Sequence, residues 1–424
     1  MGVYFLPDIY GAFCSGLIAF LGTAALVSLL SPVARRLGLV DLTGGRKRHQ
    51  GSVPLIGGIA IYLGLTSSML ALTPPWEPLG CIMAGGLLMV GVGMLDDYFA
   101  ISRGARIAAQ MGAALVAIYG ADVRLYDLGN LSLTGGMLTL GMLSVPFTVF
   151  SIVGVTNALN LIDGTDGLAG TLTVLALLAL MVMAGLAGRN ELLQVSTCLA
   201  GAVSAFLAFN LPNAQPRRGR VFLGDAGSTL LGYLLACLLI ASSQGENRVF
   251  APVIALWLLA VPLQDTVAVM VRRLASVRSP LHADRTHLHH LAMSAGLSQQ
   301  RTLFLISGTG VLYITIGLAG WFFDVSALAL LGVFLAACFY YLWWTHCAWT
   351  TRRFLGRVVC RRDEGVDSRR SRKDRRQVTT WYNFPDGLPE RRRGDRRVCT
   401  DRRGTACEGW TSAPHASAPL KAAR

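Results

Sequence analysis

Long apolar runs separated by short polar segments follow one another along residues 1–351. A helix needs about 20 apolar residues to cross the ~30 Å hydrocarbon core of a bilayer. Runs near this length predict eleven membrane-spanning helices, at residues 13–30, 55–72, 79–95, 107–120, 142–157, 170–187, 192–209, 228–242, 249–270, 303–322 and 327–344. Residues 121–141 instead alternate and carry turn residues, which predicts a small external hairpin. The pattern predicts an all-α polytopic membrane protein.

Composition agrees with this prediction and separates one end of the chain from the rest. Hydrophobic residues make up 53% and charged residues 15%, and the mean hydropathy is +0.50, which excludes an ordinary soluble domain. Residues 352–424 hold twenty Lys and Arg against nine Asp and Glu, and so account for eleven of the fourteen net positive charges. We expect a transmembrane domain at 1–351 and an arginine-rich, disordered tail at 352–424.

Arginine-rich units repeat in this tail, for example at 369–376 and 396–403. The composition favours contact with anionic inner-leaflet lipids over nucleic-acid binding or the docking of a protein. The nine cysteines, at positions 14, 81, 198, 237, 338, 347, 360, 399 and 407, form no CxxC pair. We therefore predict neither a disulfide framework nor a zinc site.

The basic residues of the loops predict the orientation. Loops after odd-numbered spans hold fifteen Lys and Arg, and loops after even-numbered spans hold only Arg124, Arg189 and Arg248. Basic loops stay in the cytoplasm, so the N-terminus is predicted in the periplasm and the C-terminus in the cytoplasm. No basic segment precedes the first apolar run, which we interpret as a retained span rather than a cleaved signal peptide.

Four polar clusters fall on the predicted cytoplasmic side. The first cluster closes the third span, and the second cluster closes the fifth span. The third cluster precedes the eighth span, and the fourth cluster follows the ninth span. In chain order they are Asp96-Asp97, Asn157-Ala-Leu-Asn160-Leu-Ile-Asp163-Gly-Thr-Asp166, Gly224-Asp225 and His287-Leu-His289-His290. Random placement would seldom put all four on one side.

Each cluster also has a structural interpretation. Asp96 and Asp97 could be solvated loop carboxylates, although a helix C-terminus disfavours negative charge. Asp225 could cap the eighth helix, and the Asn157–Asp166 stretch could join helices through hydrogen bonds. The histidines could lie on an amphipathic surface helix. Two carboxylates and two amides within ten residues are more than helix packing needs, which favours a site.

The residue types indicate phosphate chemistry. The histidine run lacks the HExxH pattern of zinc proteases, and Arg285 beside it is suited to bind a phosphate. A second cationic loop, Arg46-Lys47-Arg48-His49, is explained equally well by topology alone. Oxygen donors next to cationic groups favour Mg²⁺ or Mn²⁺ with a phosphate substrate. In a membrane protein these features predict phosphoryl transfer to or from a lipid.

In this order the four motifs resemble those of the polyprenyl-phosphate N-acetylhexosamine-1-phosphate transferases, the glycosyltransferase 4 family. The resemblance covers about residues 10–345. The Arg46–Gln50 and Asp284–His290 segments are closer to the WecA branch, which uses UDP-GlcNAc, than to the MraY branch of peptidoglycan synthesis. The arginine-rich tail departs from both branches.

The resemblance implies a bacterial inner-membrane enzyme whose site faces the cytoplasm. It would transfer GlcNAc-1-phosphate from UDP-GlcNAc to undecaprenyl phosphate, release UMP and start a lipid-linked glycan such as O-antigen. The roles that it implies are as follows: metal ligands Asp225 and Asn160; catalysis by Asp96, Asp97 and Asp163, with Asp96 as the base; nucleoside contacts from Phe222 and Asp166; phosphate or other substrate contacts from Arg46, Lys47, His49, Asn157, Arg285, His287, His289 and His290.

Alternatives remain open. The donor could be another UDP-N-acetylhexosamine, and a carboxylate could act as a covalent nucleophile. An ion-coupled transporter also needs intramembrane carboxylates, but it expects charges near the midplane and matched broken helices. Only Asp265 lies within a predicted span, where it could pair with Arg272 or Arg273. A lipid-binding scaffold would not need so many carboxylates. The sequence leaves open whether the chain forms a homodimer.

Overall fold

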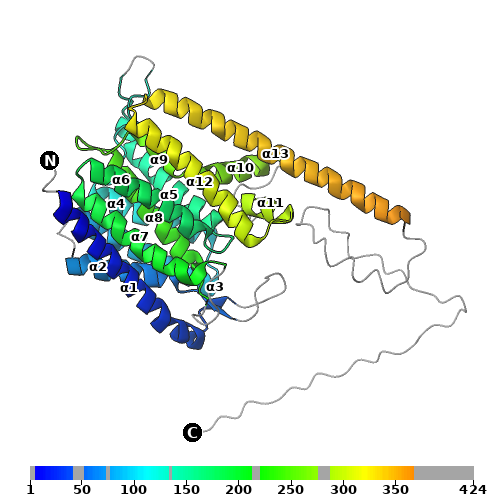
Figure 1. Cartoon of the computed structure of the whole chain (residues 1–424), viewed down its shortest axis with the longest axis horizontal. Coiled ribbons are helices and arrows are strands. Elements are labelled where there is room, and N and C mark those ends of the chain that lie inside the picture. The colour runs from blue at the N-terminus through cyan, green and yellow to red at the C-terminus, as the bar shows by residue number, and fades with distance from the viewer. Residues whose placement is uncertain are drawn as a thin grey trace, which may run out of the picture. The chain divides into compact units, whose positions relative to one another are not determined.

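Helices account for nearly all regular structure in the computed structural model (Figure 1), which describes residues 5–41, 52–72, 77–132, 136–212, 220–275 and 287–366. They are α1 (Phe5–Leu37), α2 (Gly57–Leu72), α3 (Glu77–Phe99), α4 (Arg103–Ala121), α5 (Ser144–Ile162), α6 (Leu168–Leu186), α7 (Asn190–Asn210), α8 (Gly224–Ser243), α9 (Pro252–Leu258), α10 (Ala260–Ala275), α11 (Leu288–Ser294), α12 (Gln299–Phe322) and α13 (Ala327–Val366). A 3₁₀ turn, Gly141–Leu143, precedes α5, and two short antiparallel strands, β1 (Val40–Asp41) and β2 (Val53–Pro54), follow α1.

The all-helical prediction is confirmed. In the described part of the chain, eight helices are long and apolar enough to cross a membrane, or nine if the bent pair α9 and α10 forms one span. Every predicted span falls on a helix or on that pair. The 16-residue α2 is apolar but shorter than a full span, and α4 does not meet the same measure. The count of eleven and the orientation therefore stay predictions.

The ninth predicted span, 249–270, is not a single helix as we expected. It is broken after Leu258, and α9 and α10 meet at an angle of 79°. Leu259 leaves the helical conformation, with φ −106° and ψ 12°. Pro262 then lies in the first turn of α10, where a missing backbone N–H costs little. Apolar composition alone predicted one continuous span because it does not register this break.

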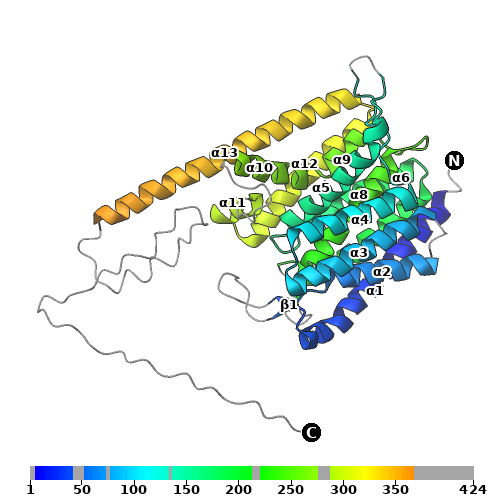
Figure 2. The ribbon, with the colours of Figure 1, turned by 180° about the vertical axis from the view of Figure 1, so that it is seen from behind.

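The helix α8 occupies the centre of the bundle. Its most apolar window is 94% buried, against 17–67% for the other candidate spans. It packs against α2, α3 and α5, while α1 lies at one edge of the bundle and α12 and α13 at the other (Figures 1 and 2). A Cβ at Gly93 of α3 would overlap Ala226 of α8, so glycine permits this close approach. The ends of α3 and α8 are thereby brought together.

Two further features bear on the predictions. The 121–141 segment forms the expected antiparallel pairing, with Leu128 N donating to Leu138 O and Leu140 N to Tyr126 O. The helix α13 continues across the predicted boundary at residue 351 to Val366. The six cysteines up to Cys347 are free thiols.

Candidate active site

Asp97 joins the end of α3 to the start of α8. The first backbone N–H groups of a helix have no partner within the helix. Asp97 accepts two of those of α8, from Asp225 N at 2.9 Å and from Ala226 N at 3.3 Å. The capping role that the sequence suggested for Asp225 therefore belongs to Asp97, and the Asp225 side chain is available for other contacts.

Asp96 is buried one residue earlier and forms an ion pair with α4. Arg106 Nη1 donates to Asp96 Oδ2 at 2.7 Å and lies 3.9 Å from Asp225 Oδ2. The guanidinium therefore stands between two carboxylates of the predicted site. A cation in this position balances part of their charge and has further donors available for a phosphate.

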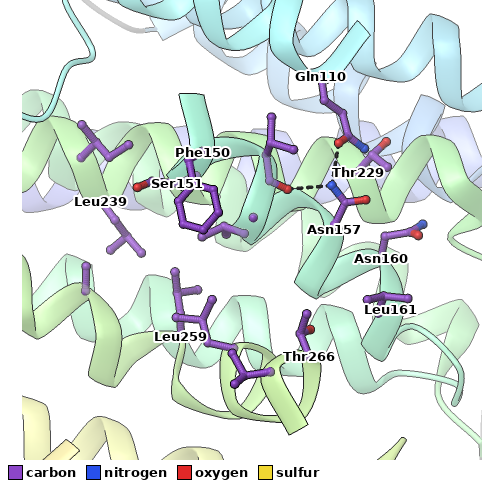
Figure 3. Close-up of a pocket in the computed structure, with 18 of the residues that line it drawn as sticks. Gln110, Phe150, Ser151, Asn157, Asn160, Leu161, Thr229, Leu239, Leu259 and Thr266 are labelled. Atoms are coloured by element: carbon purple, nitrogen blue, oxygen red, sulfur yellow. Dashed lines mark hydrogen bonds between the residues drawn. The ribbon is translucent and has the colours of Figure 1, made fainter. Parts of the chain in front are cut away.

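Asn160 connects α5 to the same centre. Its Nδ2 donates to Asp225 Oδ1 at 2.7 Å and to Ser228 Oγ at 2.8 Å. The two predicted metal ligands, Asn160 and Asp225, are thus adjacent, although they are far apart in the sequence. One turn earlier, Asn157 Nδ2 donates to Gln110 Oε1 of α4 at 2.6 Å, as Figure 3 shows.

Asp163 lies at the C-terminal end of α5, facing the charges of α3 and α8. Burial, together with the nearby charges of Asp225 and Asp97, raises the pKa of the Asp163 carboxyl well above its usual range. Such a rise is typical of carboxylates that share one site. Burial is the larger cause, and the charges of Asp225 and Asp97 place Asp163 beside the carboxylates of α3 and α8.

The two predicted nucleoside residues, Asp166 in the α5–α6 loop and Phe222 just before α8, lie beside this centre. Asp166 forms an ion pair with Arg220, and the Arg220 guanidinium lies 5.5 Å from the centroid of the Phe222 ring. Asn210, at the end of α7, accepts a hydrogen bond from Gly167 N at 2.7 Å and holds the loop in place. Asp166 and Phe222 therefore belong to one cluster, bridged by an arginine.

The histidine run packs against the same loop. His287 and His289 are buried, and their rings stack with centroids 5.7 Å apart. A Cβ at Gly164 would overlap the His289 ring. Burial, followed by the charges of His290 and His287, lowers the pKa of His289 to about 3, so this ring is neutral at pH 7.

A cavity of about 950 Å³ opens from this polar centre along α5. Its polar end is lined by Asp96, Arg103, Arg106, Gln110, Asn157, Asn160, Asp225, Thr229 and Arg273. Its remaining wall is largely apolar and includes Phe150, Leu239 and Leu259 (Figure 3). Lining residues of α5 run from Phe147 to Leu161, a rise of about 21 Å at 1.5 Å per residue. The cavity can hold a charged group at one end and a long apolar chain beyond it.

Comparison with known proteins identifies the family. The model of glycosyl transferase family 4 matches residues 79–243, which include α3 to α8 and three of the four polar motifs. Three relatives carry the name undecaprenyl-phosphate alpha-N-acetylglucosaminyl 1-phosphate transferase. That of Salmonella typhi is 36% identical over 85% of this chain and 96% of its own length. Those of Escherichia coli K12 and Haemophilus influenzae are 35% identical over 80% of this chain and 92% and 96% of their lengths. The chain belongs to this family of transferases.

The candidate site brings together most of the residues predicted from the sequence. Asp96, Asp97, Asn160, Asp163 and Asp225 share one centre, and Asn157 lies on the cavity wall. Four predicted substrate residues, Arg46, Lys47, His49 and Arg285, lie outside the described residues.

The sequence interpretation missed two contributors from α4. In the sequence, Arg106 is one of the fifteen basic residues that indicate orientation, and Gln110 lies within a predicted span without a predicted role. They are four residues apart, on one face of the helix. A buried glutamine within an apolar run was a signal that could have been used.

The donor set of the transferase site fits Mg²⁺. Its ligand candidates, Asn160 and Asp225, offer oxygen donors and are adjacent, with Asn160 Nδ2 at 2.7 Å from Asp225 Oδ1. Within the described segments no three His, Cys, Asp or Glu side chains form a metal cage. Mg²⁺ is usually held by one or two carboxylates together with substrate phosphates, so it does not require such a cage.

Proposed function

We propose that this transferase moves GlcNAc-1-phosphate from UDP-GlcNAc to undecaprenyl phosphate and releases UMP, which starts a lipid-linked surface glycan such as O-antigen. The observation that carries the proposal is the cavity, whose carboxylate and arginine end opens into an apolar channel along α5. A polyprenyl phosphate has this same division into one anionic head and one apolar chain. The names of the relatives supply the particular sugar and lipid.

In this proposal the acceptor phosphate lies at the polar end of the cavity. Arg106, between Asp96 and Asp225, donates to its oxygens, and Asp96 keeps it ionised. A phosphate monoester already loses much of its second proton near pH 7, because that pKa is about 6. The base therefore has little work to do, and direct attack on the donor is the simpler pathway.

An acceptor oxygen then forms a bond to the phosphorus of the sugar phosphate, and the bond from that phosphorus to UMP breaks. Asp225 and Asn160 would hold Mg²⁺, which neutralises the charge of the pyrophosphate. Asp163 supports the same centre, and Asp97 maintains the position of α8 by capping it. Trapping of an aspartyl phosphate after an acid quench would overturn the direct pathway.

The donor binds beside this centre. Phe222 stacks near the uracil and Asp166 contacts the nucleoside, while His287, His289, His290 and Arg285 engage the phosphates, with Arg46, Lys47, His49 and Asn157 in further contacts. The excess of basic residues in alternate loops supports a cytoplasmic site in the bacterial inner membrane, where both UDP-GlcNAc and the lipid phosphate are accessible. The basic tail supports contact with anionic lipids on that side.

The proposal is tested by giving purified protein Mg²⁺, undecaprenyl phosphate and a panel of UDP-sugars, and measuring UMP release. We expect release with UDP-GlcNAc. Release only with another UDP-N-acetylhexosamine would change the donor and keep the reaction, whereas no release with any donor would overturn the transferase assignment. Omission of divalent cations should abolish turnover.

Substitutions test the site. Asp96→Asn, Asp163→Asn and Asp225→Asn should each reduce kcat by about 100-fold or more, the usual effect of losing a general base or a charge-stabilising group. The matched control is Asp324→Asn, an exposed carboxylate in the α12–α13 turn whose positive φ of 50° asparagine tolerates well. Wild-type rates in all three site variants would show that the site lies elsewhere.

An ion-coupled transporter remains the alternative from another class, since the broken pair α9–α10 is typical of transporters. That function expects a matching break in a second helix and carboxylates near the midplane. The Asp96, Asp97, Asp163 and Asp225 cluster instead lies at helix ends. Release of UMP coupled to lipid product separates the two functions directly.

A further inference from the structure

Asp265 is a buried carboxylate in α10 that belongs to neither the acidic centre nor the cavity wall. Only 2% of its surface is exposed. The pairing with Arg272 or Arg273 that the sequence allows stays a prediction, and the hydrogen bonds of Asp265 go to other groups, the first of them His287. A buried carboxylate is costly unless its oxygens are fully hydrogen-bonded, so its partners indicate what it is for.

Three donors converge on Asp265. Its Oδ2 lies 2.8 Å from His287 Nδ1, and its Oδ1 accepts from Leu288 N at 2.9 Å and from Tyr341 OH at 3.0 Å. Two of these donors are the first residues of the histidine segment. The third, Tyr341, comes from α13 and shares Oδ1 with Leu288 N.

This arrangement determines which nitrogen of His287 carries a proton. An ionised carboxylate can only accept, so Nδ1 must be the donor to Asp265. A carboxylate on one ring nitrogen orients an imidazole and fixes its tautomer, as in carboxylate–histidine pairs at active sites. Among the residues that the structure describes, titratable or charged side chains near this pair include His289, Tyr341 and Arg272.

Packing contacts connect His287 to the α5–α6 loop, which carries Asp163. The rings of His287 and His289 are nearly parallel, with an interplanar angle of 7°. His289 in turn packs against Gly164, the residue that follows Asp163. Asp265 thus lies at the start of a contiguous path of packed groups that ends at the acidic centre.

We propose that Asp265 is a positioning residue of the transferase, which acts through His287 to hold the histidine run in one orientation against the loop that carries Asp163. The proposal rests on the proposed function, in which that run engages the donor phosphates. It gives a role to the buried carboxylate in the second turn of α10.

A double-mutant cycle on UMP release tests this role. Asp265→Asn keeps the size of the side chain but leaves one accepting oxygen for three donors, and we expect a 10- to 100-fold loss of kcat/KM for UDP-GlcNAc, as for other residues that orient an active-site imidazole. His287→Gln should lose at least as much. If Asp265 acts through His287, the double variant loses no more than His287→Gln alone. Multiplied losses would overturn the proposal.

Two tyrosines provide a matched comparison. Tyr341→Phe removes one hydrogen bond to Asp265. As a single substitution it should lower kcat/KM by a few-fold, whereas added to His287→Gln it should cause no further loss. Tyr313→Phe removes a similar bond, to Gln264 at 2.8 Å, and should leave activity unchanged. If the melting curve shows that Asp265→Asn does not fold, the double-mutant cycle of Tyr341→Phe with His287→Gln replaces it. If Tyr341→Phe then lowers kcat/KM equally in the wild type and in His287→Gln, the proposal is overturned.

A spectroscopic readout separates this proposal from the function on which it rests. In protein labelled with ¹⁵N-histidine, the His287 signal, assigned by its absence in His287→Gln, should report a protonated Nδ1. Asp265→Asn should add a second population protonated only on Nε2. An unchanged signal overturns the positioning role even if UMP is released, whereas absence of UMP release in the wild type overturns the function alone.

Discussion

Asp96 and Asp97 are neighbours in the sequence but differ in their hydrogen bonds. Asp97 gives both oxygens to the backbone of α8, while Asp96 binds Arg106 and lines the cavity. Protonation of Asp97 would weaken its hydrogen bonds to the two N–H groups that begin α8. The division supports Asp96 as the base and Asp97 as the group that maintains the geometry.

Asp163 gives a prediction on stability at this scale. Its pKa is raised by burial and by the charges of Asp225 and Asp97, so the native state holds this proton more tightly than the unfolded chain. The stabilising contribution is complete below the unfolded pKa of about 4 and is lost as pH rises through the raised native pKa. Asp163→Asn should therefore melt at a higher temperature than the wild type at pH 8 with EDTA, and the difference should shrink toward pH 4.

The check is a series of thermal unfolding curves in detergent between pH 4 and pH 8. Asp324→Asn, which removes an exposed carboxylate, serves as the control and should track the wild type at every pH. Equal melting temperatures for Asp163→Asn and the wild type at pH 8 would show that burial and the neighbouring carboxylates do not raise the pKa of Asp163.

At the scale of elements, the site depends on how closely α3 approaches α8. Gly93 faces Ala226 so closely that a Cβ would lie 2.5 Å from Ala226 N, in addition to its overlap with Ala226 Cα. Backbone atoms cannot yield as a flexible side chain can. This contact fixes the distance between the carboxylates of α3 and the first turn of α8.

Gly93→Ala should force the two helices apart and disturb the cap that Asp97 provides. Misplacement of catalytic groups by about 1 Å can cost about 100-fold in rate, so we expect at least a 10-fold fall in UMP release. Gly91→Ala, on the same helix with no atom within 4 Å of the added Cβ, should keep full activity and equal or slightly greater stability. Equal activity in the two variants would show that this contact does not govern the site.

At the scale of the whole molecule, the site is assembled from the C-terminal ends of α3 and α5, the N-terminal ends of α4 and α8, and the segment around α11. These ends gather at one side of the bundle, as an enzyme with one water-soluble and one lipid substrate requires. The orientation of the bundle decides which compartment supplies the sugar nucleotide.

Reporter fusions test that orientation. Alkaline phosphatase, which matures only outside the cytoplasm, should be active when fused after residue 188 and inactive when fused after residue 212, because the first loop is predicted periplasmic and the second cytoplasmic. A fluorescent protein that folds only in the cytoplasm should give the opposite result at the two positions. Reversal at both sites would place the acidic centre in the periplasm, where UDP-sugars are not made.

Helix content, the positions of most helices and the four polar clusters could be predicted from the sequence alone. Hydropathy and residue spacing are local properties, and a membrane requires every span to satisfy its own backbone hydrogen bonds. The same reasoning brought Asn160, Asp163 and Asp225 into one candidate site, because their positions at span ends on one side could be counted.

Which side chains meet was decided only by the tertiary structure. Asp97 rather than Asp225 caps α8, Arg106 joins Asp96 to Asp225, and Asp265 binds His287. The break after Leu258 and the burial of His289 against Gly164 likewise leave no mark in hydropathy. Each depends on contacts between segments far apart in the chain, and such contacts are selected by close packing of particular helix faces, which no local pattern specifies.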